Sequence, residues 1–262
     1  MKAPLTVVKL GGSLLEDSAQ RHRALSALAK ARQRSGNPFV VVHGGGKNVD
    51  AMMQKLGLIK KTAGGLRVTD DPTLQVVVSV LAGSVNKMLV SELHQLGVTA
   101  AGLSGADGNT IEASQHPPIG GVELGHVGFV TSVNTMLIDA ILAIGMMPLL
   151  SSVAIGSDGA LFNVNADSVA AAVATELRAE RLLFLTDVPG LKDGRGEIIH
   201  ELQLDEVSHL VGSGAITGGM LPKVQAAVAA MRSGVHSVVI AGPDQHMTVM
   251  LEGKGGTHLV AA

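Results

Sequence analysis

The sequence predicts an α/β fold, a three-layer α/β/α sandwich with a mostly parallel central sheet and hairpin lids. Short aliphatic and β-branched runs are apolar at every position, which is typical of strands buried on both faces. Longer segments rich in alanine and leucine separate these runs. A regular alternation of strand and helix favours parallel strands joined by crossover helices. At 262 residues the chain suits one large domain or two adjoining lobes.

These patterns place the elements in chain order. Strands are expected at residues 5–10, 38–42, 98–103, 147–150, 182–186 and 235–241. Helices are expected at residues 18–35, 48–56, 73–96, 134–144, 166–177 and 220–233. Pro222 suits the first turn of the last helix, where its missing N–H would have no helical partner.

Four stretches rich in glycine and polar residues are expected to be hairpins or loops, at residues 60–70, 105–110, 117–128 and 156–163. Two of them interrupt the alternation of strand and helix, as lids over a site would. A lobe boundary is expected near residues 177–181, which divides the chain into residues 1–178 and 179–262.

Composition excludes several classes of protein. Hydrophobic residues make up 46% of the chain, yet charged residues interrupt each apolar run before a membrane-spanning length is reached. The N-terminal residues enter a strand-like run without the pattern of a secretory leader, so we expect a soluble, cytoplasmic protein. The chain has no cysteine, which excludes disulfides and thiolate chemistry. Its net charge of −2 and its few aromatic residues make nucleic acid an improbable partner.

Two glycine-rich turns follow the first two predicted strands. The first is Lys9-Leu10-Gly11-Gly12-Ser13, and the second is His43-Gly44-Gly45-Gly46-Lys47. Backbone N–H groups, a helix N-terminus and a lysine can converge on phosphate oxygens at such a turn. Each turn alone could equally be a tight strand-to-helix connection. For His43 a buried, hydrogen-bonded role is favoured over a catalytic one, and Lys47 is expected to be solvated.

Other polar residues are candidates for binding. Arg67, in the predicted hairpin, could hold a carboxylate with two hydrogen bonds, although a surface arginine is the alternative. Asn163-Val164-Asn165-Ala166-Asp167 precedes a helix, so Asn165 or Asp167 is expected to cap it, while Asn163 and Asp167 could do more. The turn that begins at Asp187 resembles a nucleotide-edge loop as well as an ordinary turn. Lys223 lies in the first turn of a helix, beside free N–H groups.

Several common catalytic motifs are absent. The chain contains no Walker A sequence, no G-x-G-x-x-G fingerprint and no G-x-S-x-G elbow. His200-Glu201 is followed by Leu204 where a zinc protease would have its second histidine. These absences weigh against hydride transfer and metalloprotease chemistry.

Five short motifs occur in one order: Lys-Leu-Gly-Gly, His-Gly-Gly-Gly, Gly-Leu-Arg-Val-Thr, Asn-Val-Asn-Ala-Asp and Thr-Gly-Gly-Met-x-x-Lys. In this order and spacing the chain resembles the acetylglutamate kinases of the amino-acid kinase family over nearly its whole length. The resemblance implies ATP-dependent phosphorylation of the side-chain carboxylate of N-acetyl-L-glutamate, a step of arginine biosynthesis. It also implies an N-terminal lobe that binds the acid, a C-terminal lobe that binds ATP, and a homodimer.

The resemblance also implies roles for individual residues. Lys9 and Lys223 would neutralise the transferring phosphoryl group, and Asp167 would hold both lysines and keep them protonated. Gly45, Gly46, Arg67 and Asn163 would bind acetylglutamate. Mg²⁺ would arrive with the nucleotide. The residues that would line the ATP site are Gly11, Gly12, Asp187, Val188, Pro189, Gly190, Leu191, Lys192, Ala215, Ile216, Thr217, Gly218, Gly219, Met220, Leu221, Pro222 and Lys223.

Two departures and two alternatives accompany the resemblance. Many relatives carry lysine where this chain has Ala106, so we assign that loop no ligand. Arginine-inhibited members carry an additional N-terminal helix, whereas eight residues precede Lys9 here, so we expect a dimer insensitive to arginine. A kinase acting on acetylaminoadipate, one methylene longer, is the nearest alternative. A non-catalytic nucleotide-binding subunit is the other, and the charges of Lys9, Lys223 and Asp167 argue against it.

Overall fold

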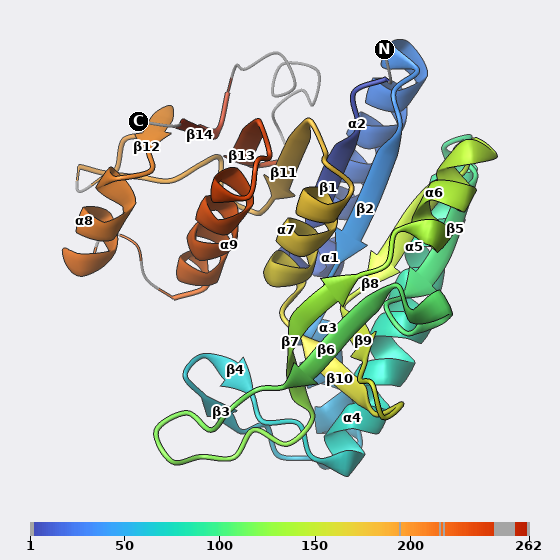
Figure 1. Cartoon of the computed structure of the whole chain (residues 1–262), viewed down its shortest axis with the longest axis vertical. Helices are drawn as coiled ribbons and strands as arrows, with labels where there is room; N and C mark the ends of the chain where they lie inside the picture. The colour runs from blue at the N-terminus through green and yellow to red at the C-terminus, as the bar shows by residue number, and fades with distance from the viewer. Residues whose placement is uncertain (1–2, 194, 215, 217, 244–254, 261–262) are drawn as a thin grey trace.

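The predicted central sheet is present. The computed structural model describes residues 3–193, 195–214, 216, 218–243 and 255–260. Its main sheet has eight strands, and all neighbouring strands are parallel except β13 and β14 (Figure 1). In sheet order the strands are β12 (Glu201–Gln203), β14 (Thr257–Val260), β13 (Ser237–Ala241), β11 (Arg181–Leu185), β1 (Thr6–Leu10), β2 (Phe39–His43), β8 (Met147–Ser151) and β5 (Ala100–Ser104). The six strands expected from apolar runs are all confirmed, and β12 and β14 were not foreseen.

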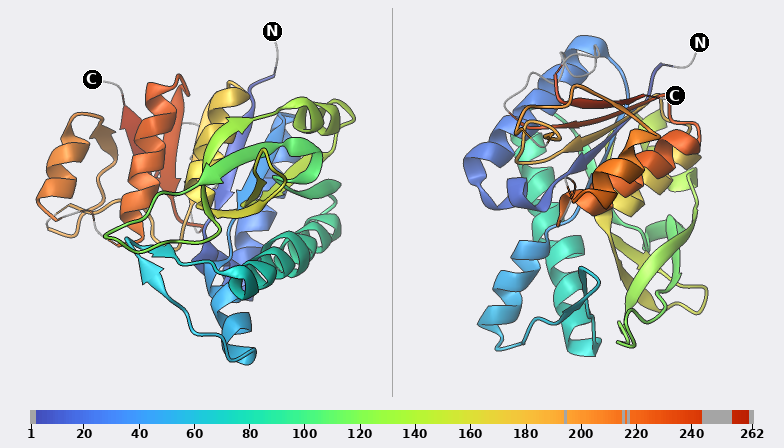
Figure 2. Two further views of the ribbon diagram at one scale, coloured as in Figure 1. Left: turned by 60° about the horizontal axis from the view of Figure 1, so that its bottom comes forward. Right: turned by 90° about the vertical axis from the view of Figure 1, so that its left-hand side faces the viewer.

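Helices cover both faces of this sheet, as Figure 2 shows, so the three-layer prediction is confirmed. Neighbouring residues of one strand point to opposite layers: Val40 and Val42 pack with one core cluster and Val41 with the other. The first cluster includes residues of α6 (Met136–Ala143), α7 (Ala166–Glu176), α8 (Glu206–Gly212) and α9 (Met220–Arg232). The second includes residues of α1 (Gly12–Glu16), α2 (Ser18–Ser35), α3 (Gly46–Lys55), α4 (Asp71–Val78) and α5 (Asn86–Gln95).

Local sequence signals account for several helix ends. The Asp17 side chain accepts hydrogen bonds from the N–H groups of Ala19 and Gln20 and thereby caps α2. The same helix stops at Gly36, whose φ of 66° suits a residue without a Cβ. The Asn165 side chain caps α7 by accepting from the N–H groups of Asp167 and Ser168, which confirms the predicted cap.

One long helix combines α4, the π-helical segment η1 (Ser79–Val85) and α5. The span Asp71–Gln95 is long and apolar enough, by length and composition, to cross a membrane. A core helix of a soluble protein passes the same test, so this is weak support for a membrane span. In this protein the apolar residues Val77, Leu81, Leu89 and Leu93 of this helix are buried in the second core cluster.

A small second sheet, closed into a barrel, lies beside the carboxyl ends of β2 and β8. It pairs β6 (Ile111–Gln115), β7 (Val127–Val133), β9 (Val153–Ile155) and β10 (Leu161–Val164), and the short helix η2 (Asp107–Asn109) precedes it. The predicted loops at residues 117–128 and 156–163 connect strands of this sheet, but its four strands were not predicted. Strands β6 and β7 mix buried and exposed positions and therefore lack the continuous apolar run of β1 or β2.

The predicted hairpin at residues 60–70 is confirmed as β3 (Thr62–Ala63) and β4 (Leu66–Arg67). It lies beside the loop that joins β6 to β7 (Figure 1). Thr69 forms a bridge with Gly125, and its N–H donates to the Leu124 carbonyl over 3.0 Å. At Gly64 an added Cβ would stand 2.8 Å from the Ile119 side chain. The two segments therefore pack as one unit at this end of the molecule.

Candidate active site

The two glycine turns meet at one edge of the main sheet. β1 pairs in parallel with both β2 and β11, so the turns that follow these three strands begin side by side. A Cβ at Gly12 would lie 3.7 Å from the Gly46 nitrogen and 3.9 Å from the Gly45 nitrogen. The turn after β1 therefore touches the turn after β2, which places their backbone groups around a common space.

Glycine is required by contact at one turn and by conformation at the other. The Gly11 N–H donates to the Leu185 carbonyl over 2.7 Å, and a Cβ at Gly11 would stand 2.8 Å from that same oxygen. Gly45 has a φ of 146°, which side-chain-bearing residues rarely adopt. Gly45 is also the N-cap of α3, and no described side chain caps that helix. The first N–H groups of α3 are thus oriented for an anion.

Three charged residues from separate elements converge beside these turns. Lys9 of β1 places its Nζ 2.6 Å from Asp167 Oδ1, and Lys223 of α9 places its Nζ 3.5 Å from Asp167 Oδ2. The Lys9 and Asp167 side chains are 5% and 7% exposed, and that of Lys223 is 13% exposed. One buried carboxylate therefore faces two ammonium groups, which leaves the cluster with a net charge of about +1.

Burial lowers the pKa of Lys9 below its ordinary value, and the nearby charge of Lys223 lowers it further. The charge of Asp167 and its hydrogen bond raise the pKa of Lys9, as the sequence led us to expect, but they do not cancel the effect of burial. The expectation that Asp167 favours the protonated lysine is correct in sign, while burial has the larger effect.

Asp187 follows β11 and faces the same cluster. Burial tends to raise the pKa of its carboxyl group, but hydrogen bonds from Thr186 and Ser13 and the charge of Lys223 outweigh it, so the pKa lies below its usual range. The Thr186 hydroxyl donates to Asp187 Oδ1 over 3.0 Å. Asp187 therefore joins the turn after β11 to the turn after β1.

The residues expected to line a nucleotide site divide into two groups. Gly218, Gly219, Asp187, Pro189 and Lys192 are exposed. Val188 and the first α9 residues, from Met220 to Lys223, are partly buried. In contrast, the side chains of Leu191 and Ile216 belong to the first core cluster, and Gly190 packs on Thr257. These three residues could meet a nucleotide only through their backbone. Ala215 and Thr217 lie outside the described residues.

A second polar cluster surrounds the hairpin arginine. Arg67 Nη2 donates to the Gly46 carbonyl over 2.8 Å, and Nη1 lies 2.5 Å from Asp50 Oδ1. Asn163 Nδ2 donates to the Thr69 hydroxyl over 3.1 Å, and that hydroxyl donates to the Arg67 carbonyl. The structure thus brings together four residues expected to bind one substrate: Gly45, Gly46, Arg67 and Asn163.

His43 and Lys47 have the roles expected for them. His43 is fully buried, its Nδ1 lies 2.9 Å from the Gly44 carbonyl, and its Nε2 accepts from Asn86 Nδ2. Burial lowers the pKa of His43 to about 4, so the ring is neutral at pH 7 and Nδ1 carries the proton. The Lys47 side chain is 64% exposed and pairs with Glu16 over 3.1 Å at the surface.

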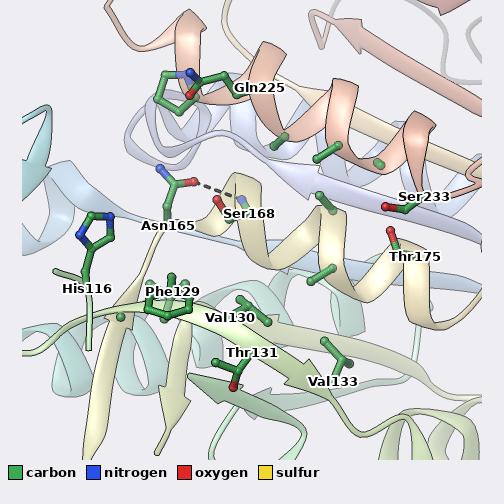
Figure 3. Close-up of a pocket in the computed structure, with 18 of the residues that line it drawn as sticks. His116, Phe129, Val130, Thr131, Val133, Asn165, Ser168, Thr175, Gln225 and Ser233 are labelled. Atoms are coloured by element: carbon green, nitrogen blue, oxygen red, sulfur yellow. Dashed lines mark hydrogen bonds between the residues drawn. The ribbon is translucent and has the colours of Figure 1, made fainter. Parts of the chain in front are cut away.

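A groove of about 680 Å³ lies elsewhere. It runs along the outer side of α7 between β7 and α9. Figure 3 shows Asn165 and Ser168 toward one end and Thr175 and Ser233 toward the other. No lysine or arginine lines it, so it lacks the cations that a phosphate site needs. We therefore place the chemistry at the cluster of Lys9, Asp167 and Lys223.

Three residues of these clusters escaped the sequence analysis. Asp50 pairs with Arg67 from α3, Ser13 hydrogen-bonds Asp187, and Thr69 orients Asn163. Ser13 and Thr69 lie within the quoted motifs but were assigned no role, while Asp50 lies four residues after Gly46 and thus on the same face of the helix. The other two depend on contacts between distant elements. No group of three or more His, Asp or Glu side chains within the described residues could hold a metal ion.

Residues 4–242 match the amino acid kinase family. An acetylglutamate kinase of Allorhizobium ampelinum is 44% identical over 94% of this chain and 86% of its own length. One from Agrobacterium fabrum is 43% identical with the same coverage. The Streptococcus mutans protein smu.665 has a structure that matches with a TM-score of 0.85, 29% identity, and coverage of 98% and 99% of the two chains. The carbamate kinase of Giardia matches with a TM-score of 0.74 at 16% identity and covers 100% of both chains, a likeness of fold.

Proposed function

The chain belongs to the amino acid kinase family, and from this premise we propose that it is an acetylglutamate kinase. It transfers the γ-phosphoryl group of ATP to the side-chain carboxylate of N-acetyl-L-glutamate and forms N-acetyl-L-glutamyl 5-phosphate in arginine biosynthesis. The observation that carries this proposal is the buried Asp167 carboxylate, which faces Lys9 and Lys223 beside two glycine turns. Relatives of the same name at 43–44% identity support it.

The reaction needs no general base. A glutamate side chain has a reference pKa of about 4.3, so its carboxylate is already a nucleophile at pH 7. One of its oxygens forms a bond to the γ-phosphorus, and the bond to the bridging oxygen breaks and leaves ADP. The difficulty is to bring two anions together, so catalysis depends on positioning and on cations along the transferring oxygens.

The described side chains suit that task. Lys9 and Lys223 are placed to neutralise the phosphoryl group, and Asp167 holds their ammonium groups at fixed positions. The glycine turns offer N–H groups to phosphate or carboxylate oxygens. Mg²⁺ in phosphoryl-transfer sites is held mainly by phosphates and water, with one or two carboxylates. Asp187 is the carboxylate beside the cluster, and Mg²⁺ would supply additional charge neutralisation when it arrives with the nucleotide.

The acceptor acid binds at the second cluster. Arg67 clamps its α-carboxylate, Asn163 adds a hydrogen bond, and the amides of Gly45 and Gly46 receive the reacting end. The segments Asp187–Lys192 and Ala215–Lys223 bind the nucleotide, and Gly190, Leu191 and Ile216 contribute only backbone groups. On this proposal residues 1–178 hold the acid and residues 179–262 hold ATP. The enzyme is a cytoplasmic homodimer, and sedimentation tests its oligomeric state.

The substrate itself is tested with a panel of acids. Purified protein is incubated with ATP, Mg²⁺ and hydroxylamine, which traps an acyl phosphate as a hydroxamate. Acetylglutamate should give hydroxamate, and free glutamate should not. Acetylaminoadipate should react at least about tenfold less efficiently, because a pocket discriminates one methylene by roughly 1–3 kcal/mol. Preference for acetylaminoadipate would make that acid the substrate, and ATP binding without hydroxamate from any acid would make the chain a non-catalytic nucleotide-binding subunit.

A further inference from the structure

One face of α3 holds the guanidinium group of Arg67. Gly46, Asp50 and Met53 are separated by four and three residues, which places them on the same side of a helix. Each contacts Arg67: the Gly46 carbonyl accepts from Nη2 over 2.8 Å, Asp50 Oδ1 lies 2.5 Å from Nη1, and Met53 Sδ lies 3.2 Å from Nη1. The hairpin arginine is thus attached to α3 at three points.

These contacts leave donors for a ligand. An arginine carries five N–H groups. Contacts within the described part of the chain engage Nη1 and one hydrogen of Nη2, and no described residue accepts from Nε. The remaining Nε and Nη2 donors can bind a carboxylate with two parallel hydrogen bonds. The Arg67 side chain is 11% exposed, so its orientation is determined by its neighbours rather than by solvent.

Asp50 does not cancel the charge of this cluster. Its second oxygen lies 2.8 Å from Lys60 Nζ, so one carboxylate is shared by two cations and a net positive charge remains. Burial tends to raise the pKa of Asp50, but its hydrogen bonds to Lys60 and Arg67 outweigh that effect and hold the pKa below its usual range. Asp50 therefore stays ionised at neutral pH while the cluster still attracts an anion.

We propose that Asp50 is a positioning residue that holds Arg67 against α3. The helix thereby fixes the distance between the two carboxylate-binding points and selects an acceptor of matching length. The proposal rests on the proposed function, in which the acceptor has two carboxylates. One is received by amides at the first turn of α3, and the other by Arg67, which Asp50 and Met53 attach to the following turns of the same helix. The span between the two binding points is therefore set within a single rigid element.

The opposite role for Asp50 is chemically reasonable and gives the opposite result. Asp50 pairs with the guanidinium group of Arg67 in the absence of substrate. If the Asp50 carboxylate had no positioning role, it would compete with the α-carboxylate of the acceptor for that guanidinium group. Removing such a competitor would tighten acceptor binding, whereas removing a positioning residue weakens it. The direction of the change in KM therefore separates the two.

The test uses Asp50→Asn, which keeps the shape of the side chain and removes its charge. We expect the KM for acetylglutamate to rise about 10- to 100-fold, with a smaller change in kcat and an unchanged KM for ATP. We also expect the preference for acetylglutamate over acetylaminoadipate to shrink, because a loosened arginine accepts the longer acid. Lys60→Met is the control: it removes the other ion pair of Asp50 and the positive charge that this pair leaves over, but Arg67 stays attached to α3. It should raise the KM for acetylglutamate less than Asp50→Asn does and leave the preference between the two acids unchanged.

A double-mutant cycle locates the effect. Added to Arg67→Ala, Asp50→Asn should cost less than about twofold more in kcat/KM, because the arginine that it orients is gone. If Asp50→Asn does not fold, Asp50→Glu tests the same point, since it keeps the charge but moves it by one methylene and should reduce the preference between the two acids.

Three results would overturn the proposal. They are a lower KM for acetylglutamate in Asp50→Asn, an unchanged preference between the two acids, and an undiminished effect of Asp50→Asn in the Arg67→Ala background. These outcomes are distinct from failure of the proposed function, which would appear as no hydroxamate from acetylglutamate with the wild-type protein.

Discussion

Replacing Asp167 by asparagine should destabilise the protein in a way that depends on pH. The Lys9 side chain is 5% exposed, and Asp167 Oδ1 lies 2.6 Å from its ammonium group. Without the carboxylate, Lys9 is a buried cation beside the like charge of Lys223. Removing one partner of a buried ion pair typically costs about 3–5 kcal/mol of folding free energy.

The proton chemistry of Lys9 sets the upper limit of that cost. Lys9 can always lose its proton, and from an ordinary pKa of 10.5 this costs roughly 5 kcal/mol at pH 7, at about 1.4 kcal/mol per pH unit. As pH rises, the free-energy cost of deprotonating Lys9 falls, so the destabilisation should decrease by up to about 1.4 kcal/mol per pH unit. At about pH 9 it should be roughly 2 kcal/mol.

Urea denaturation of wild type and Asp167→Asn at about pH 7 and pH 9 measures this free energy directly. Lys9→Met combined with Asp167→Leu is the matched control, because replacing both charges by apolar groups removes the unpaired cation. This double variant should recover most of the stability while remaining inactive. A cost below about 1 kcal/mol that does not change with pH would refute the account of Asp167 as the partner of a buried charged lysine.

Three further predictions follow from single residues. Gly45→Ala should lower the free energy of unfolding by about 1–3 kcal/mol in urea denaturation and raise the KM for the acceptor acid, because φ is 146° and the new Cβ would stand 3.0 Å from Leu81. Gly36→Ala is the control: its new Cβ has open space, so it should cost about 1 kcal/mol and leave activity unchanged. The pKa of His43, about 4 when folded and 6.5 when unfolded, means that the unfolded chain takes up a proton first as pH falls. Stability should therefore drop by about 2 kcal/mol between roughly pH 7.5 and pH 5, and His43→Asn should abolish that drop. Because burial lowers the pKa of Lys9, kcat/KM should decline at alkaline pH with a midpoint below 10.5. A midpoint at or above that value would contradict either the lowered pKa of Lys9 or the requirement that Lys9 be protonated.

The main architecture could be predicted because its signals are local. Strands buried on both faces, such as Val7 and Val8 in β1, are apolar at every position, and Asn165 caps α7 as its sequence indicates. Each glycine turn was recognised at the end of a predicted strand, and the structure brings the two together because parallel neighbours end at the same edge of a sheet. In contrast, the strands β6, β7, β9 and β10 were not recognised, since strands such as β6 and β7 mix buried and exposed positions and carry no continuous apolar run.

The contacts within the site depend on tertiary structure. The distance between Lys9 and Asp167 is decided by how α7 packs on β1, and no spacing in the sequence encodes it. Resemblance to a family indicated that these residues act together, and the geometry supplies the physical reason, a single carboxylate shared by two cations. The link between Asp50 and Arg67 joins a helix to a hairpin and became visible only in the structure.

The most direct measurement compares hydroxamate formation from acetylglutamate by wild type, Lys223→Ala and Lys47→Ala. Both lysines lie near a glycine-rich helix start, but Lys223 faces Asp167 and Lys47 is 64% exposed. The account predicts that Lys223→Ala lowers kcat by about 100- to 1,000-fold, the usual loss when one group that stabilises transition-state charge is removed. Lys47→Ala should stay within about twofold of wild type. Equal activity of the two variants would contradict the claim that the cluster around Asp167 transfers the phosphoryl group.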